Sequence, residues 1–494
     1  MPAQTSNKKQ TSHWFILVLL ALAQFMVILD VSIVNVALPT IQHAFSLSTA
    51  GLQWIISAYS LAFGGFLLLG GRNADYFGRR FTFLLGIVVF TLASLGTGLS
   101  QNGTMLIVFR ALQGLAAAYM SPAALSIVLV TYREGHERNT ALSVWGAVAS
   151  GGAAFGVLLG GIITQYTSWR WNFFINLPVG IFVTIAALKV LDHHKTEQKA
   201  KSLDLPGAVS VTMALMSLVY AFTEAPTYGW GSVRIITTLV AGVLLLLFFV
   251  LNEKRVKQPL MPLSIFRLRN IAGANALMVL MAAGLFSVFF FTTLYLQNVL
   301  HYTPIRTGLD FLIMPFVIAS VATNVPRLVK KIGYKPILVV APLFVSGGLF
   351  WISHIPLYGS FWGNIAPGLV LMGVGMGALF VSVTIAATSG VPHHESGLAS
   401  GILNTSQQVG GALGLAILAS VLSSSVSNYL HALHLHAKPS ALSIAAANVH
   451  GFHNGFLLAS GFALLASILA LIIIRVNKAA SDPSHPEPAA SLAV

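Results

Sequence analysis

The chain has 494 residues and no cysteine; 56% of the residues are apolar and only 8% are Asp, Glu, Lys or Arg. Soluble domains carry about 25% charged residues, so this composition is typical of a protein that lies largely in a membrane, and the lack of cysteine excludes disulfide bonds and thiol catalysis. The net charge of +14 does not indicate nucleic-acid binding, because the basic residues are spread over many short loops instead of one face.

Apolar segments long enough to cross about 30 Å of hydrocarbon recur along the whole chain. They predict an all-α integral membrane protein with fourteen transmembrane helices, at residues 14–37, 49–70, 81–99, 105–131, 139–164, 173–191, 206–223, 235–252, 271–297, 308–329, 337–355, 361–388, 398–424 and 454–475.

The cationic residues test this number of spans independently. With the N-terminus in the cytoplasm, 22 of the 27 Lys and Arg residues fall in cytoplasmic segments, four fall in external loops, and Arg110 lies inside a span. Adding or dropping one span would invert this bias in the rest of the chain. We therefore expect both termini to be cytoplasmic.

An internal repeat divides the chain into two halves. Gly152 and Gly156 in the fifth span are matched by Gly410 and Gly414 in the thirteenth, each 258 residues later. Two halves of six spans in the same orientation fit a parallel repeat, which leaves spans seven and eight as an extra hairpin. We expect a cytoplasmic tail at residues 1–13, a six-helix bundle at 14–191, a linker with the hairpin at 192–270, a second six-helix bundle at 271–475, and a disordered cytoplasmic tail at 476–494.

The densest charge lies between spans two and three, in residues 70–80 (GGRNADYFGRR). The spacing in this loop resembles the signature between helices 2 and 3 of the major facilitator superfamily, and the matching residues are Gly71, Asp75, Gly78, Arg79 and Arg80. Further segments resemble the fourteen-helix drug:proton antiporter branch of that family, the EmrB/QacA type. They are IVNVALP at 33–39 after Asp30, Arg110 with Gln113 and Gly114, SWRWNFFINLP at 168–178, DLPG at 204–207, and GLASGILNTSQQVGGALG at 397–414.

The resemblance implies a proton-coupled multidrug efflux transporter in a bacterial-type plasma membrane. It would export amphipathic, hydrophobic or cationic small molecules by alternating access, with protons as the coupling ion and no other cofactor. The lipid bilayer is its expected surrounding, nucleic acid is not an expected partner, and a periplasmic adaptor is left open. A metabolite symporter or facilitator of the same fold is the first alternative. An integral membrane enzyme is the second, but the membrane-embedded His, Asp and Glu residues are too few for a catalytic cluster.

Asp30 in span one and Arg110 in span four are ionisable residues inside the membrane. At 1.5 Å per residue they lie about 12 Å and about 8 Å below the external surface, so we expect them to be partners. An ionisable group in a span costs about 2.5–3.5 kcal/mol on insertion scales and needs a partner or a water-lined cavity. The resemblance implies that this pair carries proton coupling; the alternative is a static ion pair that fixes helix packing.

Two interpretations apply to the loop at residues 70–80. Its arginines satisfy the positive-inside rule without any further role. The resemblance implies instead that the loop is a cytoplasmic gate, with Asp75 docking at the positive N-terminus of span thirteen, near residues 396–397. Asn73 and Tyr76 depart from the Leu and Arg that the family usually has here.

Span five has a helix face without side chains, formed by Gly152, Gly156 and Gly160, with Gly161 beside it. Such a face indicates close helix packing, and the resemblance also places the family's antiporter motif here. Val157 stands where that motif has Pro, which leaves obligatory antiport open.

Other polar and aromatic residues of the spans are candidates for substrate contact: Asn35, Gln113, Phe291, Tyr295, Gln297, Asn404, Gln408 and Asp310. The amides would equally tie helices together. We expect Asp310 in the first turn of span ten, where a carboxylate stabilises its own helix. The loop between spans thirteen and fourteen contains histidines without Cys or acidic partners, so we expect no metal site; they are His431, His434, His436, His450 and His453.

Overall fold

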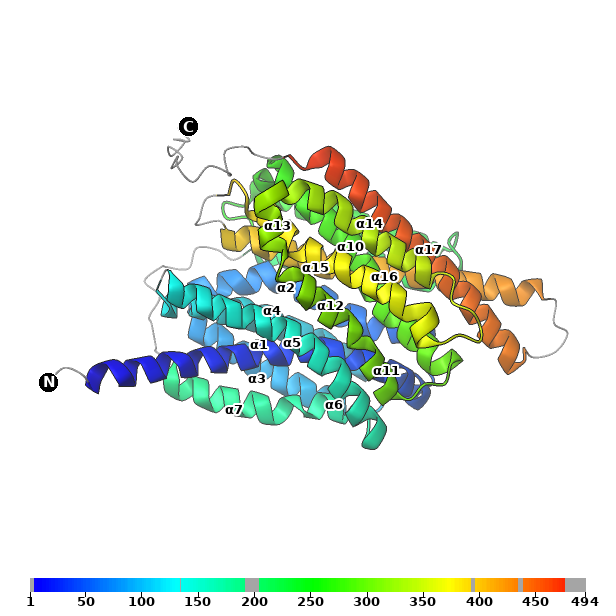
Figure 1. The fold of residues 1–494 in the computed structure, drawn as a ribbon, viewed down its shortest axis with the longest axis horizontal. Helices are drawn as coiled ribbons and strands as arrows, with labels where there is room; N and C mark the ends of the chain where they lie inside the picture. The colour runs from blue at the N-terminus through cyan, green and yellow to red at the C-terminus, as the bar shows by residue number, and fades with distance from the viewer. Residues whose placement is uncertain (1–3, 134, 192–203, 392–395, 434–438, 476–494) are drawn as a thin grey trace.

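The computed structural model describes residues 4–133, 135–191, 204–391, 396–433 and 439–475. Every regular element in these ranges is helical, and 14 helices are long and apolar enough to cross a membrane, which confirms the predicted fold class. The helices run lengthwise through the molecule, and α1 (Gln4–Phe45) begins and α17 (Ala441–Ile473) ends toward the left of Figure 1. We call this side the terminal end and the opposite side the distal end.

In chain order the elements form six spans, a hairpin of two spans and six further spans, and we call the two sets of six the N-terminal and C-terminal halves. The N-terminal half, blue to cyan in Figure 1, contains α1 (Gln4–Phe45), α2 (Thr49–Phe77), α3 (Arg79–Gly98), α4 (Gly103–Thr131), α5 (His136–Tyr166), α6 (Trp171–Phe174) and α7 (Asn176–Val190). The hairpin consists of α8 (Leu205–Tyr228) and α9 (Val233–Arg255). The C-terminal half contains η1 (Leu263–Arg267), α10 (Arg269–Leu294), η2 (Tyr295–Val299), α11 (Pro304–Phe311), α12 (Ile313–Ala322), α13 (Val325–Ile332), α14 (Tyr334–Ile352), η3 (Phe361–Ile365), α15 (Ala366–Thr388), α16 (Ser396–Ala432) and α17 (Ala441–Ile473).

Several helices extend beyond the apolar stretches that predicted them. α1 begins at Gln4, inside the expected tail, and α17 begins at Ala441 instead of residue 454. The expected long histidine loop is therefore wrong, because His431 lies in the last turn of α16 and both His450 and His453 lie in α17. Small and polar residues continue a helix past the hydrocarbon, since helix propensity does not require apolar side chains. Outside the described residues lie His434, His436 and the expected tail at 476–494.

The internal repeat is visible in the helix contacts. Gly156 of α5 lies against α1. If this glycine had a β-carbon, that atom would be only 2.6 Å from the Ser32 Cβ, so the close contact needs glycine. Gly414 of α16 lies against α10, and a β-carbon there would be 2.0 Å from the Ala283 Cβ. Hence α5 packs on α1 as α16 packs on α10, which explains why these glycines match between the halves.

The charged loop and its equivalent in the second half share a backbone conformation. Gly78 joins α2 to α3 with φ 97°, and Gly333 joins α13 to α14 with φ 77°. Only glycine adopts such positive φ values readily. The two glycines let the chain turn sharply between consecutive helices at the terminal end.

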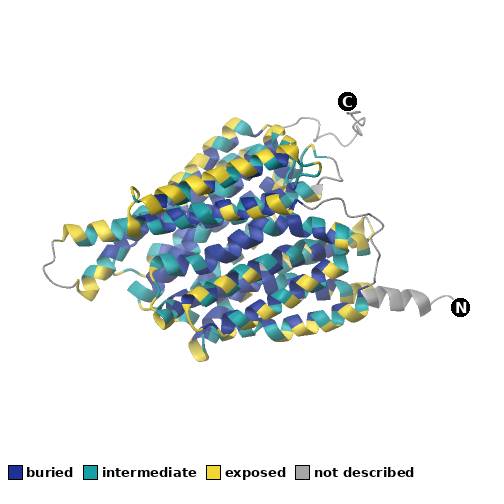
Figure 2. Cartoon of the chain, turned by 180° about the vertical axis from the view of Figure 1, so that it is seen from behind, coloured by how far each residue is buried: buried dark blue, intermediate teal, exposed yellow. Residues whose placement is uncertain are grey.

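The hairpin covers the contact between α2 of one half and α16 of the other. α8 packs against both helices, and Gln53 Nε2 on α2 donates to Thr223 Oγ1 on α8 at 3.0 Å. Figure 2 shows buried residues in the interior and exposed ones along the outer helix faces. Outward apolar side chains on helices without exposed backbone groups suit a lipid surrounding.

The close packing of α3 on α4 predicts a loss of stability when Gly86 is enlarged. A β-carbon at this position would lie 2.8 Å from the Met120 backbone nitrogen. Gly86→Val should therefore lower the unfolding temperature in detergent, at a cost of about 1–3 kcal/mol, as overpacking typically does. Gly347→Val on α14 is the matched control, because a β-carbon there meets nothing within 4 Å. Equal unfolding temperatures for the two variants would contradict this prediction.

Candidate functional site

Asp30 and Arg110 form an ion pair between α1 and α4. Arg110 Nη1 donates to Asp30 Oδ2, and the arginine and aspartate side chains are 2% and 0% exposed. Among the described residues this is the one ion pair. The predicted partnership is thus confirmed, whereas its role in proton coupling stays a prediction.

Two amide side chains complete the surroundings of the Asp30 carboxylate. Its Oδ1 accepts hydrogen bonds from Gln113 Nε2 at 3.0 Å and from Asn176 Nδ2 at 2.9 Å. Both amides also donate to Ser94 Oγ, at 2.8 Å and 3.4 Å. We call Asp30, Ser94, Arg110, Gln113 and Asn176 the Asp30 cluster. It joins α1, α3, α4 and α7 inside the N-terminal half.

Arg110 is held by groups other than Asp30 as well. Its Nε donates to the Ile55 carbonyl at 3.2 Å, and its Nη1 donates to Gln113 Oε1 at 3.0 Å. The guanidinium carbon lies 4.4 Å from the ring centroid of Tyr59. A desolvated cation over an aromatic ring gains about 2 kcal/mol. The buried cation therefore does not depend on Asp30 alone.

The cluster corrects one assignment from the sequence and adds two residues. Gln113 is a candidate for substrate contact by sequence, but its side chain is buried and bonded within the cluster. Asn176 and Ser94 were missed. Asn176 lies in the segment SWRWNFFINLP, where an amide between apolar residues is a detectable signal, whereas Ser94 is one of many serines in the spans.

The glycine face of α5 packs within its own half. A β-carbon at these glycines would meet Ile28, Ser32 or Ile33 of α1; the glycines are Gly152, Gly156 and Gly160. Their spacing therefore has a structural role in the contact of α1 with α5.

The next residues of α5 face the other half. A β-carbon at Gly161 would lie 2.6 Å from the Pro304 carbonyl oxygen, and one at Gly308 would lie 2.4 Å from the Val157 carbonyl oxygen. Val157, at the position of the motif proline, thus lies where α5 contacts α11. The two backbones approach closely because both sides present glycine.

Further contacts close the distal end between the halves. Gln297 Nε2 donates to the Val36 carbonyl at 2.9 Å, and the Ile305 N–H donates to Gln165 Oε1 at 3.1 Å. Apolar residues of α1 and α2 also join the buried core of the C-terminal half, among them Ile33, Ile41 and Ile55. Gln297, a candidate for substrate contact, makes an interdomain contact in this conformation.

The residues of the expected gate lie at the terminal end. Asp75 is exposed and forms no ion pair or hydrogen bond within the described ranges, so the expected docking on α16 is not made in this conformation. Arg80 Nη2 donates to the Leu188 carbonyl of α7 at 2.6 Å, and a β-carbon at Gly71 would lie 3.8 Å from Pro122. Arg79 is half-buried. The gate stays a prediction.

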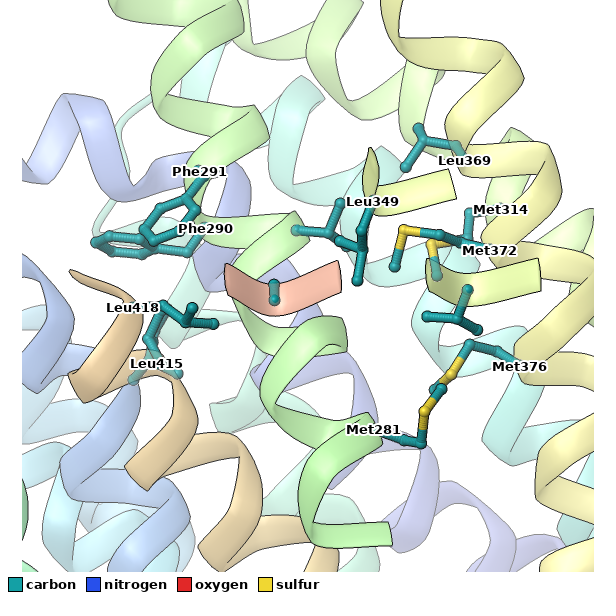
Figure 3. Close-up of a cluster of buried hydrophobic side chains, with 14 of the residues drawn as sticks. Met281, Phe290, Phe291, Met314, Leu349, Leu369, Met372, Met376, Leu415 and Leu418 are labelled. Atoms are coloured by element: carbon teal, nitrogen blue, oxygen red, sulfur yellow. The ribbon is translucent and has the colours of Figure 1, made fainter. Parts of the chain in front are cut away.

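The expected aromatic wall belongs to the core of the C-terminal half. The ring centroid of Phe291 lies 5.5 Å from that of Phe456, and Tyr295 Oη donates to the Pro356 carbonyl at 2.6 Å. Both side chains are 0% exposed. Figure 3 shows Phe291 in a buried cluster with Phe290, Leu415 and Leu418. Neither aromatic residue offers surface to a ligand in this conformation.

The remaining candidates differ in their accessibility. Asn35 Nδ2 donates to the Val31 carbonyl of its own helix at 3.0 Å, and Asn404 is exposed. Gln408 is half-buried on α16, where its Cβ limits the space at Gly64 of α2. Asp310 is not in a first turn, because α11 begins at Pro304 with Thr303 as its cap. The Asp310 Oδ2 is buried without a hydrogen-bond partner.

Metal-ligating residues are scattered in the part of the chain that the structure describes. No group of three or more His, Asp or Glu residues there is placed to hold a metal ion.

Comparison with known proteins places this fold in a family. Residues 20–415 match the model of the Major Facilitator Superfamily. The chain is 38% identical to the puromycin resistance protein pur8 of Streptomyces alboniger, over 95% of this chain and 93% of that protein. It is 38% identical to the cephamycin export protein CmcT of Amycolatopsis lactamdurans, over 83% and 85% of the two chains. It is 36% identical to the multidrug resistance protein Stp of Mycobacterium tuberculosis, over 83% and 76%.

Solved structures agree on the fold. The crystal structure of the POT family transporter PepTSo has a TM-score of 0.69 at 15% identity, covering 93% of this chain and 97% of that one. An inward-facing bacterial homologue of the lysosomal transporter Spinster has a TM-score of 0.65 at 15% identity, covering 94% and 99%. The chain belongs to the major facilitator superfamily, as a multi-pass membrane transporter of its drug-resistance and export branch.

Proposed function

We propose that this transporter exports hydrophobic or weakly cationic small molecules across a bacterial plasma membrane in exchange for protons, which bind at Asp30. Relatives that match over most of the chain and are named for antibiotic resistance or export support the direction and the substrate class. The buried Asp30–Arg110 ion pair is the observation that supports proton coupling. The bias of Lys and Arg supports cytoplasmic termini, so that the terminal end faces the cytoplasm.

Proton binding at Asp30 changes the force between α1 and α4. The neutral carboxyl no longer attracts Arg110, whose charge stays among Ile55, Gln113 and Tyr59. α1 also packs on α10 of the other half. A change in the pairing of α1 thereby reaches the interface that must rearrange during transport.

The contacts at the distal end support alternating access. With the terminal end in the cytoplasm, Gln297, Gln165 and the contact of Gly308 with Val157 close the protein toward the outside. Rocking of the halves separates these groups and opens the external side. Before this rocking, substrate would enter from the cytoplasm or the inner leaflet.

The efflux proposal predicts a specific cellular phenotype. Expression in a host that lacks its own pumps should lower the accumulation of at least one lipophilic dye or antibiotic. A proton uncoupler should erase this difference, because export against a gradient needs the proton-motive force when no nucleotide is hydrolysed. Dye fluorescence in cells measures both effects. Lower accumulation that survives uncoupling, or uptake of a sugar or amino acid, would favour a facilitator or a metabolite symporter.

Asp30→Asn should abolish uphill transport, because an amide cannot cycle a proton. It also leaves Arg110 buried without its counter-charge, which typically costs about 3–5 kcal/mol. The double variant Asp30→Asn, Arg110→Gln removes both charges and should recover most of the thermal stability without recovering transport.

Proteoliposomes with an imposed pH gradient measure this transport. Gln24→Leu is the matched control, since it removes the hydrogen bond from Ser121 to Gln24 between the same two helices at 2.8 Å without touching the cluster. Wild-type accumulation by Asp30→Asn would refute the assignment of the proton site.

Gly308→Val should prevent closure of the distal end. Its side chain would meet the Val157 carbonyl oxygen and keep α5 apart from α11. The chain has no native cysteine, so Val36→Cys provides a single thiol at a buried residue whose backbone carbonyl accepts the hydrogen bond from Gln297. In the Gly308→Val background this thiol should react faster with an impermeant maleimide from outside, and transport should fall. Unchanged labelling would show that the glycine contact does not limit closure.

A further inference from the structure

Hydrogen-bond donors meet both oxygens of the Asp30 carboxylate. Oδ2 accepts from Arg110 Nη1, and Oδ1 accepts from Gln113 Nε2 at 3.0 Å and from Asn176 Nδ2 at 2.9 Å. A carboxylate only accepts hydrogen bonds, whereas a protonated carboxyl group has an O–H that needs an acceptor. Proton uptake at Asp30 therefore requires that one of these neighbours change from donor to acceptor.

The two oxygens of Asp30 differ in their suitability for the proton. Oδ2 lies against the guanidinium of Arg110, which repels a proton and has no acceptor to offer. The ring of Tyr59 packs on that guanidinium, and its buried Oη forms no hydrogen bond with the described residues, so it does not bond to Asp30 either. The proton is therefore expected at Oδ1, between the two amides.

Gln113 cannot become the acceptor without losing another contact. Its Oε1 accepts from Arg110 Nη1 at 3.0 Å, and turning its amide would place N–H groups against the guanidinium. Ser94 is not an alternative, because its Oγ already accepts from both amides and donates to the Phe90 carbonyl at 2.8 Å.

Asn176 has no such restriction. Its Nδ2 bonds to Asp30 Oδ1 and, at 3.4 Å, to Ser94 Oγ, and its Oδ1 accepts no hydrogen bond from the described residues. The terminal torsion of an asparagine side chain is soft and roughly two-fold, so half a turn exchanges Nδ2 for Oδ1. The bond to Asp30 is then replaced by one in the opposite direction, and only the long contact with Ser94 is lost.

A second asparagine can receive the displaced N–H group. Asn172 is 0% exposed, its Nδ2 donates to Thr164 Oγ1 at 2.7 Å, and its Oδ1 is buried without a partner among the described residues. Ile175, between α6 and α7, has helical φ and ψ of −58° and −25°, so Asn172 lies one helical turn before Asn176 on the same face. An unpaired buried acceptor costs free energy, which a donor from Asn176 would recover.

We propose that Asn176 is a switching amide that follows the charge of Asp30. Its Nδ2 donates to the carboxylate. When Asp30 Oδ1 takes a proton from a hydronium ion and releases water, the amide turns, its Oδ1 accepts from the new O–H, and its Nδ2 turns toward Asn172. The bond between α1 and α7 therefore persists in both states, and the contact that weakens is the one with Arg110 on α4. The switch rests on the proposed proton site at Asp30 and adds the residue that lets the cluster hold the proton.

Infrared difference spectra between alkaline and acidic buffer, recorded on the protein in lipid, test the switch. Asp30 should contribute a carboxylic C=O band at low pH, which Asp30→Asn removes. Isotope-labelled asparagine should identify a second pair of bands, because the Asn176 carbonyl moves to lower frequency when it accepts a hydrogen bond. Asn176→Leu should remove this pair and keep the Asp30 band. Thr184→Val on α7 is the matched control, since the Thr184 hydroxyl donates to the Gly180 carbonyl of its own helix at 2.7 Å, and both signals should remain.

The possible results distinguish the switch from the proton site itself. An Asp30 band without the asparagine pair, or a pair that persists in Asn176→Leu, would overturn the switch and leave the efflux proposal intact. Absence of an Asp30 band would refute proton uptake at Asp30, and the switch with it. Where Asn176→Leu fails to fold, Asn176→Ser is smaller, keeps a hydroxyl donor and removes the same carbonyl, so it should lose the same pair.

Discussion

Lipid cannot hydrogen bond to a buried charge, so the protein itself must satisfy every polar group that its spans contain. The Asp30 cluster meets this requirement with side chains from four helices, and Arg110 gains a backbone carbonyl and an aromatic ring in addition. Removing one member leaves the others unpaired in a low-dielectric interior. The cluster therefore joins α1, α3, α4 and α7 into one body.

Contacts within each half differ in kind from contacts between the halves. Within them, α1 packs on α5 and α10 packs on α16 through glycine faces that allow close backbone approach. Van der Waals packing of this kind is the main source of helix association in lipid. Between the halves, the distal end adds hydrogen bonds from single amide side chains, such as those of Gln297 and Gln165. Breaking such bonds where water can replace them costs little, which suits an interface that opens and closes.

Features with a periodic or positional signal could be predicted from the sequence. The length of the apolar segments predicts the spans. The similar depth of Asp30 and Arg110 in the membrane predicts that they are partners, and a constant offset in residue number relates Gly152 to Gly410. The sequence does not show whether a side chain points into its own half or toward a ligand when all faces of the helix are apolar. Phe291 and Gln113 are therefore candidates for substrate contact by sequence, although each lies in the interior of its own half.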